Sequence, residues 1–177
     1  MELIGLLMWE HRLIEQIITP LQQEKEYITN QHKAHPAKII QIVDFFRTYA
    51  DKFHHGKEED ILFKELAEKP LKPEHQKIMN ELIEEHRYAR KCVGQLMEAT
   101  EKWSTGDQEA LTTITDNLNK LIQLYPKHIE KEDKHFFHPI QNYFTKQERE
   151  NLLQAGYRFD QEFTNKNYHE RMKKLLK

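Results

Sequence analysis

Apolar residues recur every three or four positions through most of this chain, which is the period of an amphipathic α-helix. Four long stretches carry the pattern: about residues 2–30, 36–69, 74–102 and 108–144. No stretch alternates in the way of a β-strand, and no internal repeat is visible. The hydrophobic pattern therefore predicts an all-α protein.

Helix-breaking and helix-starting residues separate the four stretches at short intervals. The pattern is interrupted at residues 32–36, 70–73 and 104–107. Pro36 and Pro73 suit the first turn of the helices that follow them, where no amide N–H is needed. Pro20 predicts a kink late in the first helix. Thr145 and Glu148 form a capping-box sequence, which predicts a fifth, shorter helix.

Long helices joined by short connections pack as antiparallel neighbours. We therefore expect an up-down-up-down antiparallel four-helix bundle over residues 1–144. Residues 145–177 would form a helical extension that packs on this bundle. Aromatic residues are frequent in the extension, and we expect them to cover one face of the bundle: Tyr157, Phe159, Phe163 and Tyr168.

Composition narrows the classes of function. The 27 basic and 29 acidic residues give a net charge near −2, which predicts no nucleic-acid partner. Cys92 is the single cysteine, so no internal disulfide can form and a reducing compartment is compatible. The apolar stretch 1–9 has no preceding basic run or cleavage site, and His11 and Arg12 follow it directly. We expect a cytoplasmic protein that neither crosses nor binds a membrane.

The histidines, 11 in number, suggest metal chemistry because of where they fall. His54 precedes Glu58 by four residues, and His128 precedes Glu132 by the same spacing. On a helix, positions i and i+4 lie on one face, so each pair can direct an imidazole nitrogen and a carboxylate at one point. Each pair is a two-ligand arm for a metal ion.

The phase of the second helix predicts which of its polar residues face inward. With Val43 as the centre of the apolar stripe, His54 falls within about 20° and Glu58 at about 60°. The adjacent His55 falls at about 120° and Glu59 at about 160°. This phase predicts that His54 and Glu58 face the core, and that His55 and Glu59 face solvent.

The other three helices also carry a histidine near the core. His11 and His86 flank the apolar stripes of the first and third helices, and Glu132 lies about 40° from the centre of the fourth. At about 1.5 Å per residue, these residues share one layer with His54, Glu58 and His128. A single inward histidine is more often a hydrogen-bonded core residue than a ligand. Six such groups buried together would cost several kcal/mol per unsatisfied group.

A divalent metal ion, or a pair of ions, would satisfy this whole polar layer. We therefore predict a metal site formed by His11, His54, Glu58, His86, His128 and Glu132. Imidazole and carboxylate ligands without a thiolate favour iron, manganese or zinc. Two carboxylates on opposing helices can each bridge two ions, which favours a dinuclear site.

This arrangement resembles the hemerythrin-like, HHE cation-binding family over about residues 1–144. The family pattern has a histidine on helix one, His-x-x-x-Glu on helix two, one or two histidines on helix three, and a histidine with Glu or Asp on helix four. The matching segments here are Glu10-His11-Arg12, His54 to Glu59, Glu85-His86-Arg87 and His128 to Asp133. The resemblance implies two non-heme iron ions bridged by carboxylates.

Two positions depart from the family's oxygen carriers. Arg90 stands where those proteins have a second histidine on helix three, and helix four offers both Glu132 and Asp133 as the carboxylate. The resemblance implies binding of dioxygen, peroxide, nitric oxide or iron, for sensing, storage or delivery. Two alternatives stay open: a di-iron redox enzyme acting on peroxide or nitric oxide, and a structural bundle that is metal-free or stabilised by zinc.

Overall fold

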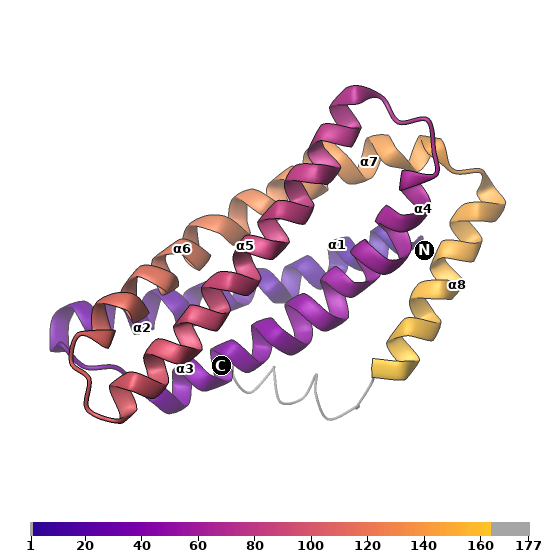
Figure 1. The fold of residues 1–177 in the computed structure, drawn as a ribbon. Coiled ribbons are helices and arrows are strands. Elements are labelled where there is room, and N and C mark those ends of the chain that lie inside the picture. Colours follow the sequence, from indigo (N-terminus) through magenta and orange to yellow (C-terminus); the bar gives the residue numbers. More distant parts are fainter. Residues whose placement is uncertain (1, 164–177) are drawn as a thin grey trace.

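The computed structural model describes residues 2–163, which fold into a bundle of long helices with a shorter C-terminal helix beside it (Figure 1). No β-strand occurs among these residues, so the predicted all-α class is confirmed. None of the helices within this range is long and apolar enough to cross a membrane. Tyr168, which we expected to cover the bundle, lies outside the described residues.

The first long helix consists of three segments in line: α1 Leu3–Ile14, the 3₁₀ turn η1 Glu15–Ile17 and α2 Ile18–Gln31. Pro20 explains the 3₁₀ turn, because a proline leaves the carbonyl four residues earlier, on Gln16, without its helical donor. The helix ends at His32, whose left-handed φ of 51° lets its N–H donate to the carbonyl of Ile28 at 2.9 Å.

The second and fourth long helices contain π-helical segments that the sequence pattern did not predict. The second runs through α3 Pro36–Phe45, η2 Phe46–His55, η3 Glu58–Phe63 and α4 Lys64–Ala67. The fourth runs through α6 Ala110–Lys131, η4 Glu132–Phe136, α7 Phe137–Ile140 and the 3₁₀ turn η5 Gln141–Tyr143. Here η2, η3 and η4 are the π-helical segments, a conformation that is rare and frequent at functional sites.

The third long helix, α5 Pro73–Ser104, is unbroken and packs against both α3 and α6. The first helix closes the ring through contacts of α2 with α6 and α3. The C-terminal helix α8 Lys146–Phe163 lies against α1 and η3 (Figure 1). Its predicted capping box is formed, because Thr145 N–H donates to Glu148 at 2.7 Å and Glu148 N–H donates to the Thr145 hydroxyl at 3.3 Å.

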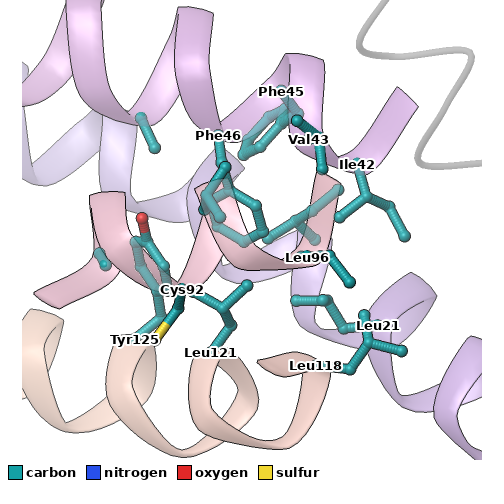
Figure 2. Close-up of a cluster of buried hydrophobic side chains, with 14 of the residues drawn as sticks. Leu21, Ile42, Val43, Phe45, Phe46, Cys92, Leu96, Leu118, Leu121 and Tyr125 are labelled. Carbon is teal, nitrogen blue, oxygen red and sulfur yellow. The ribbon is translucent and has the colours of Figure 1, made fainter. Parts of the chain in front are cut away.

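The apolar core is divided into two clusters with a polar layer between them. Figure 2 shows part of the larger cluster, where aromatic and aliphatic side chains meet: Phe45, Phe46, Leu96, Leu121 and Tyr125. The second cluster lies toward α8. Along α5, for example, Leu82 belongs to the second cluster, Ala89 belongs to the larger one, and the fully buried His86 lies between them. The layer expected from the positions of the histidines thus separates two hydrophobic cores.

Substitution by alanine should change the free energy of unfolding differently at two glycines in helix interiors. An added Cβ at Gly94 in α5 meets no atom within 4 Å, whereas at Gly56 it would lie 2.7 Å from the Phe159 ring of α8. Gly94→Ala should therefore raise the free energy of unfolding by about 0.5–1 kcal/mol. Gly56→Ala should be less stable than Gly94→Ala by at least about 1 kcal/mol, because overpacking opposes the gain in helix propensity. Urea unfolding of both variants tests this, and equal stabilities would contradict the close packing of α8 on this helix.

Candidate metal centre

The six predicted ligands are all buried and lie together in the polar layer. The first helix contributes His11, the second His54 and Glu58, the third His86, and the fourth His128 and Glu132. The layer is therefore built from all four long helices, as the helical phase and depth of these residues predicted.

The Nε2 atoms of four histidines converge on two carboxylates. Glu58 Oε1 is 3.3 Å from Nε2 of His54, and Glu58 Oε2 is 3.4 Å from Nε2 of His86. Glu132 Oε2 is 3.1 Å from Nε2 of His11 and 3.4 Å from Nε2 of His128, while Oε1 is 3.9 Å from Nε2 of His86. Each carboxylate therefore joins histidines from different helices.

These inner atoms lack ordinary hydrogen bonds. Glu58 and Glu132 have no exposed surface, and none of their four oxygens has a hydrogen-bond partner within the described residues. The Nε2 atoms of His86 and His128 lie 3.2 Å apart. If both imidazoles are neutral and carry their proton on Nδ1, the lone pairs of the two Nε2 atoms point toward each other. A cation would fit between these nitrogen lone pairs and carboxylate oxygens. Without such compensation, burial of the two carboxylates would be costly.

The possible ligand atoms form two compact groups. One contains His11, His54, Glu58 and Glu132, and the other contains His55, His86 and His128. Within each group the ligand atoms lie within 4.8 Å of one another. Because Glu58 and Glu132 also approach His86, the two groups share their carboxylates. This arrangement fits two adjacent cations better than one.

The prediction that His55 faces solvent is wrong. Its side chain is 2% exposed, and its ring stacks on that of His86 with 3.8 Å between centroids. The phase was calculated for an α-helix, but η2 is π-helical up to His55. With i→i+5 hydrogen bonding each turn takes up an extra residue, so the chain rotates less per residue and His55 returns to the inner face. The adjacent His54-His55 and Glu58-Glu59 pairs were a signal that more than one register was possible.

Glu59 has an outer position, but not a purely solvated one. Its side chain is 27% exposed, and it accepts hydrogen bonds from His86 Nδ1–H and from Arg90, both at 2.7 Å. It therefore lies behind a histidine of the layer and not within the layer itself.

Each of the four histidines that face the carboxylates is held from behind in the same way. The Nδ1–H groups donate to outer carboxylates, with distances of 2.7 Å for His11 to Asp133, 2.9 Å for His54 to Glu10, 2.7 Å for His86 to Glu59 and 2.8 Å for His128 to Glu85. These bonds fix the tautomer and leave each Nε2 free to act as a ligand. Carboxylates in this position are typical of histidines that bind metals in proteins.

The sequence carried an unrecognised signal for these outer carboxylates. Each of them is the direct neighbour of a residue in the inner layer: Glu10 of His11, Glu59 of Glu58, Glu85 of His86, and Asp133 of Glu132. Each supports a histidine on a different helix from its own, so only the assembled bundle reveals the pairing. The structure also separates the two helix-four carboxylates, since Glu132 faces the histidines and Asp133 lies outside, bonded to His11.

Each of the four outer carboxylates is in turn paired with a lysine or an arginine. Asp133 pairs with Arg12, Glu10 with Lys57, Glu59 with Arg90, and Glu85 with Lys131. Lys57 is fully buried, and it also pairs with Asp160 of α8, 2.7 Å away. Arg90, at the position of the family's second helix-three histidine, thus supports Glu59 and is no ligand itself.

The carboxylates strongly perturb the histidines. Burial opposes the charged form, but the hydrogen bond with Asp133 and the nearby Glu132 carboxylate raise the pKa of His11 to about 10. Burial likewise opposes charge on His86, yet the nearby Glu132 carboxylate and the hydrogen bond with Glu59 raise its pKa to about 9. His55 has no such carboxylate, and burial together with the charges of His86 and His54 lowers its pKa well below 6.5. In metal-free protein these raised pKa values favour protonated His11 and His86 at neutral pH, which offsets the charge of the buried carboxylates.

Metal-free protein should accordingly lose stability in alkaline solution. The pKa values of His11 and His86 are raised on folding, so their contribution is complete below pH about 6.5 and is lost as the pH rises through about 9 to 10. His55 is neutral across this window and adds nothing. We expect the free energy of unfolding in urea to fall by more than about 1.4 kcal/mol, the equivalent of a one-unit pKa shift. A flat profile between pH 6.5 and 10 would contradict this electrostatic description.

Comparison with known proteins agrees with this geometry. The family model for the Hemerythrin HHE cation binding domain matches residues 2–139, which include both groups of possible ligands. Neither the curated proteins nor the solved structures offered a match. The match spans most of the sequence, and the chain belongs to the hemerythrin HHE cation-binding domain family.

Proposed function

We propose that this protein binds a pair of iron ions and uses them to bind dioxygen or another small ligand, or to hold iron, for sensing, storage or delivery. One observation carries the proposal: four fully buried carboxylate oxygens, with no hydrogen-bond partner among residues 2–163, face histidine Nε2 atoms from all four long helices. Belonging to a cation-binding family supports it.

The two groups of residues suggest how the ions would be shared. His11 and His54 would hold one ion, His86 and His128 the other, and Glu58 and Glu132 would bridge them. His55, from the second group, adds a fifth histidine that the sequence pattern alone did not identify. The absence of thiolate among these donors favours iron, manganese or zinc.

This donor set leaves room for an external ligand. Five histidines and two bridging carboxylates offer fewer donor atoms than two octahedral ions require. An iron pair supplies reversible changes of oxidation state to whatever ligand takes an open position. The chain's own part is to orient each Nε2 through an outer carboxylate and to exclude water with the apolar clusters on both sides of the layer.

Metal content and reaction with oxygen test this function. Protein expressed in iron-replete medium should contain about two iron ions per chain, and the reduced form should gain a visible absorption band on exposure to oxygen.

His54→Ala and His86→Ala should each lower the iron content by about half, while His135→Ala, at an exposed position, should leave it unchanged. Iron-free protein would sink the proposal, and zinc without visible absorption would favour the structural alternative. Catalytic turnover of peroxide or nitric oxide with an electron donor would favour the enzymatic alternative.

The outer carboxylates allow a second test with closely matched variants. Glu85 accepts the Nδ1–H of His128, whereas the adjacent Glu84 pairs with Arg87 on the surface. Glu85→Gln should weaken metal affinity by roughly tenfold to a hundredfold, because the outer partner orients the ligand and raises its basicity. Glu84→Gln should leave the affinity unchanged. Equal affinities in competition with a chelator would show that these outer bonds do not serve a metal site.

A further inference from the structure

A cavity of about 250 Å³ reaches from the surface to His55. It lies between the second, third and fourth long helices, and its lining includes Phe46, Asp51, His55, Ala89, Arg90 and Val93. Water occupies about 30 Å³ in the liquid, so this space admits a molecule considerably larger than a diatomic gas. The polar layer is therefore not sealed on this side.

The inner end of the cavity presents an unpartnered polar group. His55 is 2% exposed, and its Nδ1 has no hydrogen-bond partner in the part of the chain that the structure describes. The Asp51 Oδ1 atom lies 3.6 Å from this nitrogen. The four histidines described above all have an outer carboxylate in hydrogen-bonding contact, so His55 differs from them. A buried nitrogen that lines a cavity without a partner points to a ligand or water at that place.

The walls favour an uncharged molecule. Phe46, Ala89 and Val93 form apolar surface, as expected for a pocket that holds a small neutral ligand. The charges nearby cancel, because Arg47 and Arg90 are matched by Asp51 and by Glu59, which holds Arg90. The cavity thus offers no net charge with which to attract an anion.

Arg90 is a partly exposed part of the cavity's lining. Its Nε donates to Asp51 and its Nη2 donates to Glu59, both at 2.7 Å, so the guanidinium spans two positions on the second helix two turns apart. The side chain is 37% exposed and can move toward solvent without losing a buried position. Movement of one side chain would widen the path to His55.

We propose that this cavity is the route by which a small uncharged molecule reaches the metal pair, with Arg90 as its gate. The inference rests on the proposed function, because the route ends at the metal pair. The cavity itself can be tested without metal. A ligand enters past Arg90, crosses the apolar walls, and arrives beside His55 at the edge of the second group of histidines.

The first experiment uses xenon and metal-free protein. The ¹²⁹Xe chemical shift should change with protein concentration for the natural sequence and for Gly94→Ala, a change on α5 that meets no neighbouring atom. Ala89→Leu fills the cavity and should abolish this change, and the milder Val93→Leu should reduce it. An unchanged xenon response in both filling variants would overturn the assignment of the cavity.

The second experiment uses dioxygen and iron-loaded, reduced protein mixed in a stopped-flow instrument. At equal iron content, Ala89→Leu should slow the absorption change by at least about tenfold. Arg90→Ala should accelerate it several-fold, whereas Arg87→Ala, which breaks only a surface ion pair with Glu84 on the same helix, should not change it. Equal rates in all variants would overturn the route. Lack of iron in every variant would instead refute the proposed function, and the xenon result would still decide on the cavity.

Discussion

Two carboxylates buried between apolar clusters impose the central constraint on this bundle. Glu58 and Glu132 have no exposed surface, and an unpaired buried carboxylate costs several kcal/mol. Each of the four long helices places a histidine Nε2 atom close to the oxygens of these carboxylates. The raised pKa values of His11 and His86 favour protons on these two rings when no metal is bound, and metal binding must displace them. Stability and metal affinity are therefore coupled through the same few atoms.

Hydrogen bonds and ion pairs connect the buried layer to the surface of the bundle. Each histidine that faces the two carboxylates is backed by another carboxylate, and each of those is paired with a lysine or arginine. One chain of contacts runs from His54 through Glu10 and the buried Lys57 to Asp160, so it connects the layer to α8. The C-terminal helix therefore takes part in positioning the layer, in addition to covering apolar surface.

The π-helical segments are the backbone's contribution to the same arrangement. His54 and His55 lie in η2, Glu58 begins η3 and Glu132 begins η4. A regular α-helix would turn either His54 or His55 away from the core, whereas the wider turn buries both. The irregular geometry occurs where the polar residues of the layer converge, and α5, which supplies the single inner residue His86, remains regular.

Sequence alone determined the helices, the capping box at Thr145, and six residues of the polar layer, because helical periodicity and i, i+4 spacing are local properties. It failed for His55 because tertiary demands converted part of the helix to π geometry and changed the phase. Tertiary structure also decided that Glu132 and not Asp133 faces the histidines. The pairing of Glu10 with His54 and of Glu85 with His128 joins residues more than 40 positions apart, which no local pattern can specify. The residues of the layer could be predicted from the helical periodicity, whereas the orientation of their side chains depends on how the helices pack together.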